Sequence, residues 1–193
     1  MARLIINVNL KPNNMKKIII LFVFIAGIAT GDAQLYTTRN AFVSFYSKAV
    51  MENITADNNQ VYSIIDAGKK NIAFSLLMRS FIFKKQLMQD HFNENYVESD
   101  KYPKAFFSGT YTGDVILGRD GLYKIMVKGN LTLHNVTKAI ELPATMEVKD
   151  GKLSGNAEFK IKPEDYNISI PSVVRDNIAK ELTITVNANY ITH

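Results

Sequence analysis

Regular alternation between apolar and polar residues in the second half of the chain limits the possible folds more than any other feature. Residues 123–133, 140–148, 153–161 and 182–190 place mostly apolar side chains at every second position, and mostly Lys, Glu, Asn and Thr between them. Successive side chains of a β-strand point to opposite faces of a sheet, so such alternation is typical of antiparallel strands with one buried and one solvated face. The pattern therefore predicts four such strands.

The first half is less regular, but it contains enough further strands to complete a barrel. Four strands are expected there: residues 40–50, 60–67, 72–78 and 105–114. Turn-forming residues at 58–59 (Asn-Asn), 118–121 and 150–151 predict hairpins between neighbouring strands. Eight strands are typical of a small closed barrel in which every strand edge is paired. The sequence thus predicts an all-β, single-domain, eight-stranded antiparallel barrel.

Two stretches interrupt the strand pattern. Residues 81–98 predict a short helical or irregular excursion between strands, and its apolar residues are Phe81, Phe83, Leu87, Met88 and Phe92. Residues 172–180 predict a helical turn before the last strand. The chain shows no internal repeat and no linker, so residues 34–193 are expected to form one domain.

The first 33 residues have the features of a secretory signal peptide. A basic pair follows Met15, an apolar run covers residues 18–29, and small residues lead to an expected cleavage site after Ala33. Residues 1–14 are interpreted as an over-long start, because Met15 begins a complete signal. The apolar run is shorter than the about 20 residues that a membrane-spanning helix needs, which disfavours the alternative of an uncleaved anchor. We therefore expect an exported protein, located in the periplasm without stable membrane insertion.

Charge and cysteine content exclude several classes of function. The formal net charge of the whole chain is +5, but the basic residues of the first 33 positions account for most of it. The remaining charge, about +2, predicts no electrostatic affinity for nucleic acid. The chain contains no cysteine, which excludes thiol catalysis, cysteine zinc sites and a lipid-modified cysteine. Polar residues such as Lys124, Lys128 and Glu158 occupy the outer strand positions, so a barrel embedded in an outer membrane is disfavoured.

The residues that commonly carry catalysis or bind metals form no recognisable motif. His91, His134 and His193 lack the spacing of metal ligands, and no nucleophile elbow, phosphate loop or dinucleotide fingerprint occurs. We therefore expect no metal site, no cofactor and no catalytic residue. His134 is interpreted as a hydrogen-bonding residue that fixes its turn, with a catalytic role as the alternative. His91 is expected either to clamp the 81–98 excursion or to line an entrance.

Several segments of the sequence carry motifs of a known family. The matching segments are residues 91–93 (HFN), 98–107 (ESDKYPKAFF), 129–138 (GNLTLHNVTK), Phe159 and residues 165–168 (DYNI). They are similar to a histidine-led segment followed by Tyr-Pro and an aromatic residue, a Gly-x-Leu-Thr-x-His-Gly-Val-Thr-Lys hairpin, and a closing Asp-Tyr/Phe-Gly-Ile signature. In this order, over about residues 35–191, they resemble the YceI-like family of exported lipid-binding proteins.

The resemblance implies an extended, lipocalin-like antiparallel barrel that holds a polyisoprenoid, an isoprenoid quinone or an amphiphile of that shape. Such proteins are typically periplasmic. The chain departs from the family pattern at Asn135 and Asn167, where glycine is usual, and its N-terminal strands lack a histidine-containing opening. Asparagine tolerates the left-handed backbone conformation of glycine, so both turns are expected to survive. The altered N-terminal strands leave the pocket shape and the identity of the ligand open.

The candidate ligand-binding residues follow from the inward positions of the expected strands and from the excursion. They are rich in Phe, Tyr and Met and have almost no polar group, so a ligand is expected to be long and apolar. The wall candidates are Ile72, Phe74, Leu76, Phe107, Tyr123, Ile125, Val127, Leu131, Leu133, Ile140, Leu142, Met146, Phe159, Ile161, Tyr166, Ile184 and Val186. Phe81, Phe83, Met88 and Phe92 are expected to form a lid.

Three functions from different classes are compatible with this sequence. The leading hypothesis is a carrier or storage protein for a long-chain isoprenoid or another apolar lipid. A second is an enzyme acting on such a lipid, for which His91, His134 and Tyr166 are the candidate proton-transfer groups. A third is an interaction module whose barrel is filled by side chains. The sequence leaves open whether the chain forms a homodimer.

Overall fold

The computed structural model describes residues 34–48, 53–170 and 179–192. All of them fall within one unit of the chain, Ala33–His193. The expected signal peptide lies outside the described residues, as does nearly all of the expected helical turn at 172–180. Both therefore stay predictions.

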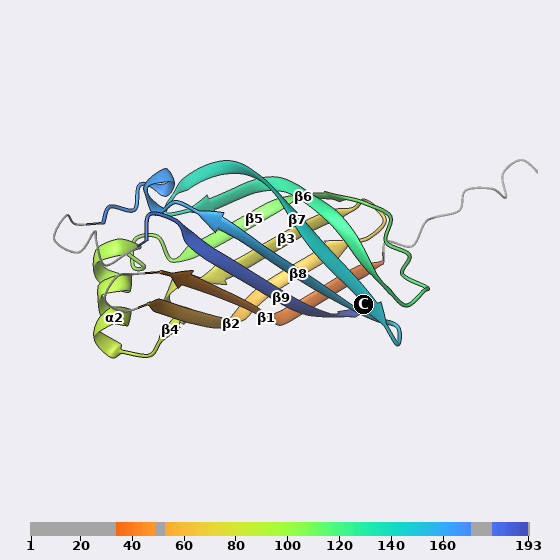
Figure 1. The fold of residues 1–193 in the computed structure, drawn as a ribbon, viewed down its shortest axis with the longest axis horizontal. Helices are drawn as coiled ribbons and strands as arrows, with labels where there is room; N and C mark the ends of the chain where they lie inside the picture. The colour runs from red at the N-terminus through yellow and green to blue at the C-terminus, as the bar shows by residue number, and fades with distance from the viewer. Residues whose placement is uncertain (1–33, 49–52, 171–178, 193) are drawn as a thin grey trace, which may run out of the picture. The chain divides into compact units, whose positions relative to one another are not determined.

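Eight antiparallel strands of the described residues form a closed barrel (Figure 1). Their bounds are β1 (Leu35–Ser47), β2 (Ile54–Asp66), β3 (Asn71–Leu77), β5 (Lys104–Thr112), β6 (Gly121–Leu133), β7 (Val136–Lys149), β8 (Lys152–Ile161) and β9 (Leu182–Thr192). Neighbouring strands pair in the order β1-β9-β8-β7-β6-β5-β3-β2, and β2 pairs again with β1. This last pairing closes the barrel, so the predicted eight-stranded antiparallel architecture is confirmed.

Short elements between β3 and β5 cover one end of the barrel. The two-residue strand β4 (Ile82–Phe83) pairs with β2, and it is followed by helix α2 (Gln86–His91) and a π-helical turn, η2 (Phe92–Tyr96). In Figure 1, α2 and β4 lie at the end of the barrel opposite the β7–β8 hairpin. The expected helical or irregular excursion at 81–98 is confirmed. The remaining short elements are two 3₁₀ turns, η1 (Met78–Ser80) and η3 (Pro163–Tyr166).

The alternation read from the sequence corresponds to the inside and outside of the barrel. On β6, Ile125 and Val127 are buried, while Lys124 and Lys128 on either side of this pair are exposed. On β7, Leu142 is buried and Glu141 is exposed. Burying a large aliphatic side chain stabilises a protein by about 1.5–3 kcal/mol. Removal of the inward row of every strand from water is therefore the main force that holds the barrel together.

Two tight hairpin turns each contain two successive residues in the left-handed backbone conformation, with positive φ angles. His134 and Asn135 connect β6 to β7 with φ angles of 50° and 58°. Asp150 and Gly151 connect β7 to β8 with φ angles of 50° and 71°. Two successive residues with positive φ match the right-handed twist of the flanking strands. Asn167, with a φ of 57°, is also left-handed, so asparagine replaces the usual glycine of the family at both departures without losing the turn.

The predicted turn at Asn58-Asn59 is wrong, because both residues lie inside β2. The pairing of β1 with β2 shifts register here, from Ala41↔Val61 to Val43↔Asn58, which marks a β-bulge. The fully buried Asn58 side chain accepts a hydrogen bond from Gln60 N at 2.9 Å and donates one from Nδ2 to the Leu77 carbonyl at 3.0 Å. Asn58 thus stabilises a β-bulge through its side-chain hydrogen bonds and does not form a chain reversal.

Strands β5 and β6 approach each other closely where two glycines face each other. Gly109 and Gly129 are direct partners in this ladder. A Cβ atom at Gly129 would lie 2.4 Å from the Ser108 carbonyl oxygen and 2.7 Å from Phe107 Cζ, so no side chain fits. The Phe107 ring lies over this glycine, and the close approach of the backbones fixes the ring on the inner wall.

Candidate ligand-binding cavity

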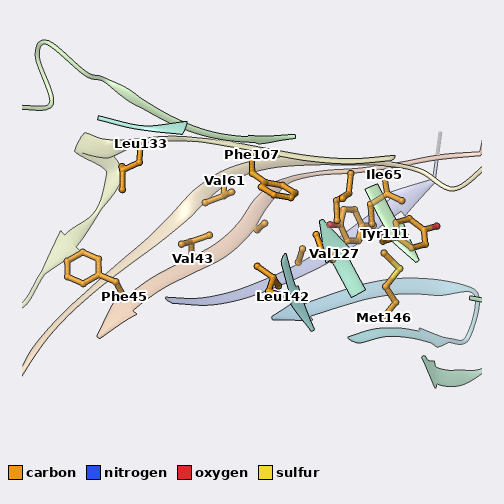
Figure 2. Close-up of a cluster of buried hydrophobic side chains, with 14 of the residues drawn as sticks. Val43, Phe45, Val61, Ile65, Phe107, Tyr111, Val127, Leu133, Leu142 and Met146 are labelled. Atoms are coloured by element: carbon orange, nitrogen blue, oxygen red, sulfur yellow. The ribbon is translucent and has the colours of Figure 1, made fainter. Parts of the chain in front are cut away.

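The barrel encloses a cavity of about 460 Å³ that all eight long strands help to line. This volume falls in the range of about 300–1,000 Å³ that is usual for small-molecule sites. Figure 2 shows the interior, with Phe45 and Leu133 toward one end and Ile65, Tyr111 and Met146 toward the other. The lumen is therefore open in the structure, which disfavours a barrel filled by its own side chains.

Nineteen of the twenty-one candidate residues line this cavity, and they come from both the wall and the excursion. They are Ile72, Phe74, Leu76, Phe81, Phe83, Met88, Phe92, Phe107, Ile125, Val127, Leu131, Leu133, Ile140, Leu142, Met146, Phe159, Ile161, Ile184 and Val186. The alternation thus brings together side chains that are more than a hundred residues apart in the sequence.

Tyr123 and Tyr166 are the two candidates that do not line the cavity. The Tyr123 hydroxyl lies 2.8 Å from the Arg119 carbonyl oxygen and 3.1 Å from that of Ile116, so it donates to the β5–β6 loop. Tyr166 is buried in η3, and burial, followed by the nearby charge of Asp165, raises the pKa of its phenol. Both tyrosines stabilise the structure around the cavity and do not form part of its surface.

A cluster of phenylalanines covers the end of the cavity beneath α2. Phe45 of β1 packs against Phe81, Phe83 and Phe92, with ring centroids 5.5, 5.7 and 5.6 Å away. The Phe83 and Phe92 centroids lie 5.0 Å apart. The cover is held by the pairing of β4 with β2 and by a hydrogen bond of 3.2 Å from Phe83 N to Gln89 Oε1. We call these four phenylalanines the lid cluster.

Tyrosines fill the opposite end of the barrel. Tyr36, Tyr111 and Tyr190 are all buried, and the Tyr190 hydroxyl forms a 2.9 Å hydrogen bond with the fully buried Ser63 hydroxyl. Burial raises the pKa of each of these three phenols. We call these three tyrosines the floor cluster, since Tyr190 forms part of the cavity surface there and the other two pack outside it.

Polar groups are rare on the surface of the cavity. Of the described lining residues, His91 is the one histidine, and it lies on α2 at the lid end. Ser47 also lines the cavity, but its hydroxyl accepts a hydrogen bond of 2.9 Å from Ala179 N. The site can therefore bind an apolar chain along most of its length, and the His91 imidazole at the lid end is placed to contact a polar end group.

His134 lies outside the cavity and connects three segments of the chain. Its Nδ1 lies 3.1 Å from the Tyr166 carbonyl oxygen, and its Nε2 lies 3.1 Å from Glu98 Oε2. The Tyr102 ring packs edge-on against the imidazole, with centroids 4.2 Å apart. The expected hydrogen-bonding role is thus present, but its partners are distant segments rather than the local turn. Of the three candidate proton-transfer groups, only His91 reaches the cavity.

Sequence reasoning missed the contributions of the first two strands to the cavity. Val43, Phe45, Ile54 and Ile65 all line it, yet none was among the wall candidates. Val43 and Phe45 follow the same period of two as the later strands. That signal was readable, but bulges interrupt it within β1 and β2.

The described part of the chain holds neither a cluster of metal-binding side chains nor a membrane-spanning helix. No group of three or more His, Asp or Glu side chains within residues 34–48, 53–170 and 179–192 is arranged to hold a metal ion. Over the same residues, none of the helices is both long enough and apolar enough to span a bilayer.

Fold and cavity together define a small antiparallel barrel of the kind that encloses one apolar ligand. The model of the YceI-like domain family matches residues 35–190, and the chain belongs to this family. Curated proteins give no match.

Several solved structures share the fold. A polyisoprenoid-binding domain from Saccharophagus degradans, implicated in plant cell wall breakdown, has a TM-score of 0.71 at 14% identity, covering 83% of this chain and 99% of that domain. BcnA of Burkholderia cenocepacia has a TM-score of 0.65 at 17% identity, covering 78% of this chain and 96% of BcnA. The YCEI protein of Campylobacter jejuni has a TM-score of 0.53 at 22% identity, covering 74% and 88%. The barrel is thus conserved in shape far beyond its sequence.

Proposed function

We propose that this protein binds one long apolar lipid, a polyisoprenoid, an isoprenoid quinone or a similar amphiphile, inside the barrel. The observation that carries the proposal is the composition of the cavity surface, where apolar side chains from all eight long strands predominate. The fold shared with a polyisoprenoid-binding domain supports the same class of ligand.

The hydrophobic effect supplies the binding energy in this proposal. Removing apolar surface from water is favourable by about 25 cal/mol per Å², or about 0.8 kcal/mol for each methylene. A chain of many methyl and methylene groups therefore gains affinity with length until the cavity is full. A polar head group gains nothing along the wall, so it is expected to remain at the lid end near His91.

We further propose that the protein is exported to the periplasm and acts there in lipid transport or storage. The signal-like N-terminal sequence supports export, and the solvated outer face of the strands supports a role as a carrier in water. Binding rather than catalysis is favoured, because two of the three candidate proton-transfer groups, His134 and Tyr166, lie away from the cavity.

Native mass spectrometry of residues 34–193, purified from the periplasm of its own host without detergent, tests the proposal. A stoichiometric adduct, identified as an isoprenoid or quinone after organic extraction, is the expected result. Recovery of the lipid in chemically unaltered form after incubation supports a carrier over an enzyme. Absence of any adduct, together with no uptake of added polyisoprenoid, would overturn the proposal.

A charged wall variant makes the same test specific to the cavity. Leu142→Asp places a carboxylate on the apolar surface and is expected to abolish lipid uptake, because the charge loses its hydration there. Leu122→Asp on the neighbouring strand β6 is the matched control, since Leu122 is exposed and does not line the cavity. Circular dichroism and urea unfolding verify that both variants fold. Normal uptake by a folded Leu142→Asp protein would remove this wall from the site.

A further inference from the structure

The ladder between β7 and β8 covers only part of the two strands. Their pairing runs from Lys149↔Lys152 to Ala144↔Ala157 and then stops. β7 nevertheless continues to pair with β6 as far as Val136, and β8 continues to pair with β9 as far as Ile161. In Figure 1 the β7 and β8 ribbons diverge toward the end that carries α2. We call this parting, between residues 136–143 and 158–161, the β7–β8 window.

Proline explains where the ladder ends. Pro143 is the residue of β7 next to the last β7–β8 pair, and it has no N–H to donate. The β6–β7 register passes through Met126↔Pro143 without a break, so the missing donor falls on the side that faces β8. Proline within a sheet is confined to strand edges and bulges for this reason. Local sequence chemistry therefore keeps β7 and β8 apart from this point onward.

Contacts close the window at both of its ends. The Ala144↔Ala157 pair closes the end nearer the β7–β8 hairpin. At the other end, nearer the β6–β7 hairpin, Lys138 Nζ lies 3.5 Å from Asp165 Oδ1, and His134 Nδ1 lies 3.1 Å from the Tyr166 carbonyl oxygen. These contacts join the β6–β7 hairpin to η3 across the parting. At about 3.4 Å per residue, the unpaired stretch of β8, residues 158–161, extends on the order of 15 Å along the strand.

The margins of the window are apolar and belong to the cavity. Ile140 and Leu142 on one side and Phe159 and Ile161 on the other all line it. Ile140, Phe159 and Ile161 are only half-buried, unlike Leu142. Within the described part of the chain, no strand other than β6 pairs with 136–143 and none other than β9 pairs with 158–161.

A second parting in the barrel shows what a covered gap looks like. β2 and β3 pair only as far as Val61↔Leu76, but β2 then pairs with β4 through Ala56↔Phe83. The lid cluster fills the space behind that pairing. The β7–β8 window has no corresponding strand among the described residues.

We propose that the apolar chain of the ligand enters and leaves sideways, through the β7–β8 window, with Leu142 and Phe159 as the gate. This inference rests on the proposed function. Passing a chain between two paired strands would leave several backbone groups without hydrogen bonds, each at a cost of about 1–3 kcal/mol. In the window no β7–β8 ladder bond needs to break, and only side chains must rotate. The lid cluster stays packed throughout.

A cross-link across the window tests the route. Because the chain has no native cysteine, the reagent reacts only with the introduced thiols. Glu141 and Lys160 occupy outward positions that would face each other if the ladder continued. A Glu141→Cys/Lys160→Cys variant is joined by a short bismaleimide, which spans a wider gap than a disulfide. Each residue loses only an exposed ion pair, to Lys128 and Glu181 respectively, so little stability is lost.

The matched control is a Glu147→Cys/Ser154→Cys variant, joined by the same reagent across a rung that is already paired and that does not line the cavity. The measurement is the exchange rate of labelled geranylgeraniol, loaded before cross-linking. Joining the window is expected to slow exchange by roughly tenfold or more, whereas the control cross-link leaves the rate unchanged.

Three results distinguish the outcomes. Slower exchange only in the window variant supports the route. Equal exchange rates in both cross-linked variants overturn it and leave the proposed function intact. Failure of the uncross-linked protein to bind any isoprenoid overturns the proposed function, and the route with it.

A Pro143→Val variant repeats the test without a reagent. Valine restores the N–H on the side of β7 that faces β8, which is expected to extend the ladder and to slow exchange in the same direction. Extension can be followed by amide hydrogen exchange in residues 158–161. New protection there combined with an unchanged exchange rate of the probe would count against the window as the route.

Discussion

The two ends of the barrel are both packed with aromatic rings, but the floor cluster consists of tyrosines and the lid cluster of phenylalanines. At the floor, the Tyr190 hydroxyl bonds to Ser63, and both partners are buried. At the lid, Phe45, Phe83 and Phe92 contact one another only through ring faces and edges. A buried hydrogen bond fixes one geometry, whereas apolar contacts permit several with similar energy. The comparison indicates a rigid floor and an adaptable lid.

The rings of the floor cluster are also more completely buried than those of the lid cluster. Tyr36, Tyr111 and Tyr190 are all in the core of the barrel, whereas only two of the four lid phenylalanines are, because Phe83 and Phe92 are partly exposed. The lid segment contributes a two-residue strand and a six-residue helix, and α2 has no fully buried residue. Segments with little buried surface open at lower free energy than the core of a fold. The lid end is therefore expected to adapt to ligands while the floor end sets the depth of the cavity.

Truncating one ring at each end is expected to give the largest contrast. Tyr190→Ala should lower the free energy of unfolding by about 3–5 kcal/mol, because it leaves a cavity in the core and an unpaired Ser63 hydroxyl. Phe92→Ala should lower it by only about 1–2 kcal/mol, since this ring is partly exposed. Urea unfolding followed by circular dichroism measures both. Equal losses would contradict the distinction between floor and lid.

High pH is expected to weaken the floor and to leave the lid unaffected. Burial raises the pKa of Tyr190 above its ordinary value, and burial together with the charges of Asp66 and Tyr36 raises that of Tyr111. The unfolded chain releases these protons near pH 10 while the folded protein keeps them. The contribution of these tyrosines to the free energy of unfolding is therefore constant below about pH 10 and decreases above it, by up to about 1.4 kcal/mol per pH unit for each such tyrosine.

Urea unfolding between about pH 9 and pH 11 measures this slope. Tyr190→Phe is the matched control, because it keeps the ring and removes one titrating group. A shallower slope in this variant is the expected result. Tyr166 is unchanged in both proteins, so its own raised pKa does not affect the difference. An identical slope would show that Tyr190 titrates alike in the folded and unfolded states.

Loosening the lid is expected to have the smallest effect on stability. Gln89→Ala removes the acceptor of the Phe83 N–H and should cost less than about 1 kcal/mol, since the lid segment is partly solvated. Amide hydrogen exchange should accelerate at Phe83. The Tyr111 amide, which donates to the Lys70 carbonyl at the floor, serves as the internal control. Equal acceleration at both amides would indicate that the two ends open together.

The barrel and most of its inner surface were predictable from the sequence because inward and outward positions obey a period of two. Phe159 is an example, since it lies between the charged residues Glu158 and Lys160. The period gives the face of a residue but not its height in the barrel. Tyr123 lies on the predicted side, yet it is close enough to the β5–β6 loop to bond there instead of lining the cavity.

Other features depend on partners that are distant in sequence. Asn58 is compatible with a turn or a bulge, and the contact with the Leu77 carbonyl decides between them. The three-segment connection at His134 requires Glu98 and the Tyr166 carbonyl, neither of which is near it in the chain. The window depends on where the β7–β8 pairing ends, and alternation alone does not encode that position.

The pairing of β1 with β9 also has a consequence for how the chain folds. The first strand of the barrel completes its hydrogen bonds only when the last strand is present. Until then a nascent chain holds a meander with two unpaired edges, and contacts between sequence-distant strands form slowly. The barrel therefore cannot close before β9 has been synthesised. This delay would favour the export proposed above, because premature closure would block the passage of an extended chain across a membrane.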